Sequence, residues 1–176
     1  MNDKNKVNAD LSGLNDLISA LNKEYTLRVG ILGSQAKAKH KGSDLTNAEI
    51  GTFHEFGGEK MPRRSFLEDS LKFKLDFSRE DMKPLKKQIW KLVFVKKKIE
   101  QFYQDLGAKC LQIIEEGFAT NGFGMWQPLS KRSEQSKINK VKSKKKREIY
   151  WTEHNILTDT GQLRRSITFK VFKKKR

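Results

Sequence analysis

Apolar residues near the two ends of the chain follow the spacing of a helix and of two strands. Five of them predict a short amphipathic helix over residues 10–23: Leu11, Leu14, Leu17, Ile18 and Leu21. Every second residue from Leu27 to Ile31 is apolar, which is the period of a strand, and the same alternation returns from Ile167 to Val171. We therefore expect these two segments to be strands of one small sheet.

From Phe66 to about Phe118 the apolar spacing is mostly helical. Nine apolar residues keep roughly one face: Leu85, Ile89, Leu92, Ile99, Phe102, Leu106, Cys110, Ile113 and Ile114. Pro84 lacks the amide that a helix interior needs, so we expect a break or kink there, with Ser78 to Met82 as the interruption. Because two strands alone are marginal in water, the predicted fold is α+β, a small antiparallel-type sheet packed by one long, kinked helix plus short helices.

The segment 45–58 predicts a short helix with both ends marked. Thr46 and Glu49 have the spacing of a capping box, in which the hydroxyl and the carboxylate satisfy amides at the helix start. Gly57 and Gly58 are expected to end this helix, because glycine accepts the left-handed backbone of a helix C-terminus. Its buried stripe is predicted to be Ile50, Phe53 and Phe56.

A second helix start is predicted a few residues later. Pro62 keeps the chain extended just before it. Ser65 and Glu68 repeat the capping-box spacing, so we expect this helix to begin at Phe66. The segment contains no plausible catalytic set. It predicts the end of one helix, a basic turn and the start of a second helix.

The net charge of the chain favours an acidic binding partner. The 176 residues contain 37 Lys plus Arg against 21 Asp plus Glu, a formal charge of +16, which favours nucleic acid, an acidic protein surface or a membrane. The length predicts one domain, 1–176, with a core formed by 25–130 and 149–173. Residues 131–148 are rich in Lys and Arg and poor in apolar residues, so we expect a basic, mobile arm or loop.

No apolar run approaches the ~20 residues of a membrane span, and the N-terminus lacks the apolar stretch of a signal peptide. The single cysteine, Cys110, excludes an internal disulfide framework and fits a reducing compartment. We expect a soluble, intracellularly made protein without membrane contact.

The titratable residues do not form a recognisable catalytic set. His40, His54 and His154 have no partner at metal-ligand spacing, and the H-E-x-x-H pattern begun by His54 and Glu55 has Gly58 where its second histidine belongs. Glu49 and Glu55 are expected on different faces of their helix. We predict no enzyme activity, no cofactor and no metal, and we expect His54 to be a satisfied structural residue.

Three separated stretches of the sequence carry distinct motifs. The first is A-x-I-x-x-F-H-E-F-G-G from Ala48, followed by P-R-R-S-F-L from Pro62. The second is W-Q-P-L-S from Trp126, with Ser133 and Lys137 after it. The third is L-T-D-T-G-Q-L-R from Leu157, with Ser166 and Ile167 after it. Together and in this order, they resemble phage virion-morphogenesis or tail-completion proteins, also called head–tail connector or neck proteins.

This resemblance implies a structural virion protein that completes the tail or joins head to tail as a subunit of a ring. It implies six or twelve copies, neighbouring neck and tail proteins as partners, and a place in the virion neck or tail after assembly in the host cytoplasm. The residues predicted to contact a neighbouring subunit or partner are His54, Glu55, Phe56, Arg63, Arg64, Phe66, Trp126, Leu163 and Arg164. The two arginines would offer forked donors to a neighbour's carboxylates.

The alternative is a basic nucleic-acid-binding protein that neutralises phosphates with its Lys- and Arg-rich segments. Its DNA-facing candidates are Lys142, Lys144, Lys145, Lys146 and Arg147. Such binding would weaken steeply with salt. In a ring through which DNA passes, the same charge would give only weak, sequence-independent contact with DNA.

Overall fold

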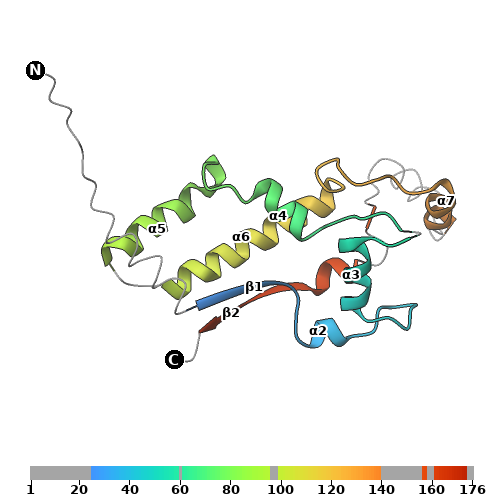
Figure 1. Ribbon diagram of the computed structural model, residues 1–176, viewed down its shortest axis with the longest axis horizontal. Coiled ribbons are helices and arrows are strands. Elements are labelled where there is room, and N and C mark those ends of the chain that lie inside the picture. The colour runs from blue at the N-terminus through green and yellow to red at the C-terminus, as the bar shows by residue number, and fades with distance from the viewer. Residues whose placement is uncertain (1–24, 60, 96–98, 140–155, 158–160, 174–176) are drawn as a thin grey trace, which may run out of the picture.

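The computed structural model describes residues 25–59, 61–95, 99–139, 156–157 and 161–173 (Figure 1). Its strands are β1 (Tyr25–Ile31) and β2 (Ile167–Lys173). Its helices are α2 (Ser34–Lys37), α3 (Asn47–Phe56), α4 (Glu68–Lys74), the 3-10 turn η1 (Glu80–Met82), α5 (Lys83–Val95), α6 (Ile99–Ala119), α7 (Lys131–Asn139) and α9 (Gln162–Ser166). The predicted helix 10–23 lies outside the described residues.

The two predicted strands form the expected sheet. β1 and β2 pair antiparallel, with Leu27 opposite Val171 and Val29 opposite Phe169. The 21-residue helix α6 packs against both strands, as Figure 1 shows. The α+β class, with a small antiparallel sheet packed by a long helix, is thereby confirmed.

The long helical stretch consists of two helices that pack against each other. Gln88 Nε2 of α5 donates to Asp105 Oδ2 of α6 at 2.5 Å. Pro84 is the second residue of α5, a position whose amide needs no helical partner, so the predicted break falls before it. The apolar face expected on one helix is divided between two, and a small core of Met82, Leu85 and Phe102 forms there.

The larger core lies at the other end of α6. Its buried residues come from segments far apart in the chain: Phe66, Ile114, Phe118, Trp126, Ile156 and Leu163. Trp126 is 7% exposed and meets Phe118 edge-on, with ring centroids 5.8 Å apart. This core holds the segments that carry the three sequence motifs.

Part of the predicted basic arm is helical. Residues 131–139 form α7, where we expected a mobile arm or loop over 131–148. Ile138 is only 6% exposed. Its buried side chain packs α7 onto the protein, a contact that the mainly basic composition of the segment did not indicate. Residues 140–148, which include the five DNA-facing candidates, lie outside the described residues.

A glycine sets how closely α6 approaches β2. A Cβ at Gly107 would lie 2.3 Å from Cδ2 of the Phe169 ring, far inside van der Waals contact. Helix propensity favours alanine over glycine by about 1 kcal/mol, whereas overpacking a core costs about 1–3 kcal/mol. The steric clash therefore outweighs the gain in helix propensity, and a larger residue at position 107 should destabilise the fold.

We predict that Gly107→Ala lowers the free energy of unfolding in urea by on the order of 1–2 kcal/mol, despite the better helix propensity of alanine. Ala108→Gly, at the exposed neighbouring position, measures the propensity term alone. Adding Phe169→Leu to Gly107→Ala should recover part of the loss in a double-mutant cycle. A stabilised Gly107→Ala variant would show that α6 does not lie this close to β2.

Candidate functional site

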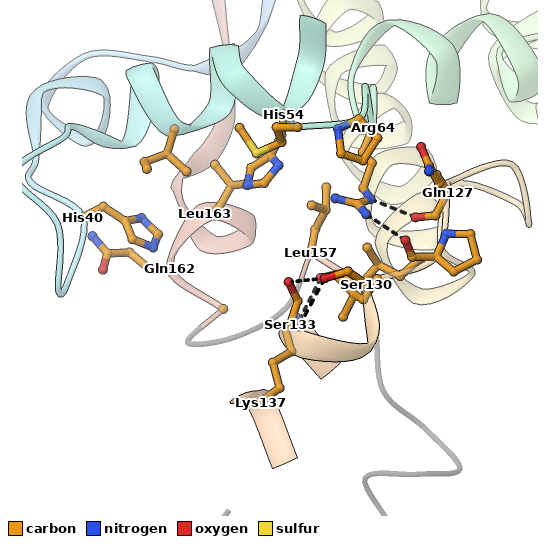
Figure 2. Close-up of a pocket in the computed structure, with 17 residues that line it drawn as sticks. His40, His54, Arg64, Gln127, Ser130, Ser133, Lys137, Leu157, Gln162 and Leu163 are labelled. Carbon is orange, nitrogen blue, oxygen red and sulfur yellow. Dashed lines mark hydrogen bonds between the residues drawn. The ribbon is translucent and has the colours of Figure 1, made fainter. Parts of the chain in front are cut away.

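The segments that carry the three motifs meet at one end of the molecule. There they line a cavity of about 670 Å³ (Figure 2). Its walls come from α3, from residues 61–64, from the stretch 127–137 that includes α7, and from residues 156–157 and 161–163. We call this space the basic cavity, because His40, His54, Arg64 and Lys137 all line it.

The carboxylate of Glu55 connects α3 to the start of α4. Glu55 is 6% exposed. Its Oε1 accepts from Ser65 Oγ at 2.6 Å and from the amide of Glu68 at 2.9 Å. Its Oε2 accepts from the amides of Phe66 and Leu67, both at 3.0 Å. Four donors and the positive end of a helix stabilise this buried charge.

The second predicted helix starts later than expected, because the Glu55 carboxylate accepts hydrogen bonds from the amides of residues 66–68. α4 begins at Glu68, two residues after the predicted start at Phe66. The predicted capping box of Ser65 and Glu68 does not form, since the N-cap of α4 is Leu67, whose side chain makes no cap hydrogen bond. Ser65 Oγ accepts from the amide of Asp69 at 2.9 Å, and the Glu68 side chain pairs with Lys72. Glu55 supplies the carboxylate that the local sequence was expected to supply. By contrast, the capping box of Thr46 and Glu49 forms as predicted, and Gly57 ends α3.

The buried face of α3 is polar and small. It consists of Asn47, Gly51 and Glu55, and the predicted stripe of Ile50, Phe53 and Phe56 is therefore wrong. Ile50 is only partly buried, whereas Phe53 is 44% and Phe56 67% exposed. A Cβ at Gly51 would lie 2.5 Å from Cδ1 of Ile31, so the helix turns its glycine to β1 and its phenylalanines outward.

The arginine turn is tied to the tryptophan motif. Arg64 is 6% exposed; its Nε donates to the carbonyl of Gln127 at 3.0 Å and its Nη2 to that of Pro128 at 3.2 Å, as Figure 2 shows. The indole of Trp126 donates back to the carbonyl of Ser65 at 3.2 Å. Arg63 points to the surface and forms a forked pair with Asp69 of its own chain, at 2.5 and 2.8 Å.

The C-terminal motif is tied to the start of α3. Gln162 Nε2 donates to Asn47 Oδ1 at 3.0 Å and to the carbonyl of Lys39 at 2.9 Å, and Gln162 Oε1 accepts from the amide of Lys41. His40 Nδ1 also lies 3.0 Å from Asn47 Oδ1. These polar residues were not among the sequence candidates, since a glutamine after T-G and an asparagine after a cap carry no distinct local signal.

Most of the predicted contact residues lie inside the subunit. Five are at most 7% exposed and cannot supply contact surface, so their predicted interface role is wrong: Glu55, Arg64, Phe66, Trp126 and Leu163. Phe56 and Arg63 are accessible, and His54 lines the basic cavity. Arg164 is partly exposed and pairs with Glu115 of α6.

His54 is not the satisfied histidine that we expected. Its Nδ1 is buried and has no hydrogen-bond partner within the described ranges. Burial, followed by the nearby positive charges of Arg64, His40 and Lys137, lowers the pKa of the imidazole to about 4. The imidazole is therefore neutral at neutral pH.

We predict that an NMR titration of the His54 imidazole will give a pKa of about 4. An unfolded histidine binds its proton near its usual value of 6.5, so the unfolded chain holds more protons between these two values. The contribution of His54 to stability should therefore fall as the pH drops from 6.5 towards 4. Subtracting the same curve for His54→Gln removes the carboxylates that titrate in this range; equal curves would contradict the prediction.

We predict that Glu55→Gln lowers the free energy of unfolding by roughly 3 kcal/mol, because an amide leaves buried donors unsatisfied and adds donors of its own. Glu49→Gln, on the same helix but exposed, should lose clearly less. Amide hydrogen exchange should accelerate at Phe66, Leu67 and Glu68 in the first variant alone. Equal losses in the two variants would mean that the Glu55 cap adds nothing beyond a surface cap.

Within the described part of the chain, no three His, Cys, Asp or Glu side chains are grouped to hold a metal ion, and no helix is long and apolar enough to cross a membrane. No protein-family model, no curated protein and no solved structure matches this chain.

Proposed function

We propose that this protein is a structural virion protein of the phage neck or tail end, which completes the tail or connects head to tail as a ring subunit. The observation that carries the proposal is the convergence of the motifs. The three stretches that resemble the family are separated by tens of residues, yet they line one cavity. Hydrogen bonds of Arg64 and Trp126 join the first two stretches. Lys137 donates to the carbonyl of Ile156 just before the third stretch, and Gln162 of the third donates to Asn47 just before the first. Residues that recur together in a family are expected to have such a shared structural cause.

The surface of α3 supplies a contact for assembly. Phe53 and Phe56 project from a helix whose inner face is already committed to Asn47, Gly51 and Glu55. Beside them lies an apolar depression lined by Ile31, Leu67 and Leu71, among others. Exposed aromatic side chains next to an apolar depression are typical of protein–protein interfaces.

Nucleic-acid binding remains the second candidate, and one feature of the sheet favours it. Arg28 and Lys170 stand directly opposite each other on β1 and β2, and Arg28 lies 5.1 Å from the Phe172 ring centroid. Like charges at paired positions repel, and an anionic partner would relieve that repulsion. The two cations suit contact with a phosphate backbone, and the exposed aromatic beside them suits stacking on an unpaired base.

We predict that light scattering on the purified chain gives a discrete ring-sized oligomer at both low and high salt, because apolar contacts are not screened by ions. Phe53→Ser combined with Phe56→Ser should shift the mass towards the monomer. Met125→Ser, which removes a side chain that is 56% exposed on the loop after α6, should leave the mass unchanged.

A wild-type chain that is monomeric at both salt concentrations would contradict self-assembly. Duplex DNA binding would then be measured against salt, and an affinity that falls steeply as salt rises would favour the second candidate.

A further inference from the structure

The two-stranded sheet has one face that α6 covers and one face that it leaves open. Phe169 of β2 lies against Gly107 of α6, and Val29 is its partner on β1. Side chains alternate across a sheet, so the residues on either side of these two turn to the other face. We call this other face the outer sheet face, and its central cross-strand pairs are Thr26 with Phe172 and Arg28 with Lys170.

The outer sheet face carries positive charge without a carboxylate to balance it. Arg28 and Lys170 are exposed, and neither strand contains an acidic residue. Among the ion pairs between described residues, none includes Arg28 or Lys170. Both cations are therefore available to an anionic partner.

The two cations point away from each other along the direction of the strands. The Arg28 guanidinium lies 5.1 Å from the centroid of the Phe172 ring, towards the end of the sheet at which β1 begins. The Lys170 ammonium lies 3.1 Å from the position that a Cβ would take at Gly33, just beyond the other end of β1. Charges spread in this way suit a run of phosphates along a backbone better than one small anion.

Phe172 adds a flat apolar surface beside these charges. Its side chain is 43% exposed, and it stands on a strand whose partner holds it in a regular register. Aromatic rings and guanidinium planes both stack on nucleic-acid bases, provided that the bases are unpaired and can leave their own stack. The bases of a duplex are not available to a ring on an open sheet face.

We propose that the outer sheet face binds single-stranded nucleic acid, with Phe172 against a base and with Arg28 and Lys170 against phosphates. This inference rests on the second candidate function, nucleic-acid binding, because it gives that function a site and a strand form. It does not require the ring. The site differs from the sequence-predicted one at 142–147, which lies outside the described residues.

Fluorescence anisotropy of a short labelled oligo-dT with the full-length chain tests the site. We expect the wild type to bind oligo-dT several-fold tighter than a duplex of equal length. Phe172→Leu keeps an apolar side chain but removes the ring, so it should weaken binding about five-fold or more and leave the salt dependence unchanged. Lys170→Ala should reduce the slope of log affinity against log salt by about 0.7, the share of one phosphate on a single strand.

Two matched controls change the same residue types elsewhere on the surface. Phe73→Leu removes a ring that is 54% exposed on α4, and Lys86→Ala removes one exposed positive charge on α5. Neither should reproduce the effect of its counterpart on the sheet, and urea unfolding verifies that every variant is folded. Equal effects in site and control variants would overturn the proposal. So would a duplex that binds as tightly as oligo-dT. Oligo-U in the same titration distinguishes an RNA strand from a DNA strand.

The result separates the site from the function on which it rests. Oligo-dT binding that the Phe172 and Lys170 variants leave intact would refute the outer sheet face and leave nucleic-acid binding standing, with residues 142–147 as its remaining candidates. Absence of binding to oligo-dT and to duplex would contradict both. Neither outcome bears on the ring subunit, which light scattering tests.

Discussion

The buried carboxylate of Glu55 is the constraint on which the arrangement of this protein depends. A carboxylate removed from water is tolerated only with several hydrogen-bond donors, and here all four come from the four residues 65–68, the last of which begins α4. The distance and angle between α3 and α4 are therefore fixed. Arg64 precedes this stretch and Ser65 begins it, and their bonds to residues 126–128 position the loop that leads to α7.

Specific polar contacts determine the position of segments that the modest core could not fix alone. Only 36% of residues are hydrophobic, and the two buried clusters lie at different places along α6. Between them, glycines bring elements together: Gly107 admits the Phe169 ring and Gly51 admits Ile31. Gln162 and Asn47 join segments 115 residues apart in the chain. Hydrogen bonds of this kind add little net stability but penalise alternative arrangements strongly.

Local patterns in the sequence predict both strands and α3 correctly, but they do not predict the contacts that build the candidate site. Alternation defined both strands, and the Thr46–Glu49 box with Gly57 defined α3, because these interactions lie within a few residues. Glu55 acts on an element beyond the next turn, so its spacing to Ser65 follows no helical or strand period. The stripe of phenylalanines misled for a related reason, since periodicity identifies an apolar face without saying whether it turns to the core or to a partner.

Most buried polar side chains at this end of the molecule have a structural role, which favours binding over catalysis as its function. Internal hydrogen bonds that join separate segments of the chain engage Glu55, Arg64 and Gln162. Burial is the main cause of the low pKa of His54, and the nearby positive charges of Arg64, His40 and Lys137 add to it. Phe53 and Phe56 remain exposed on α3, so the proposed assembly contact falls on the one face of this helix that the buried polar contacts leave open.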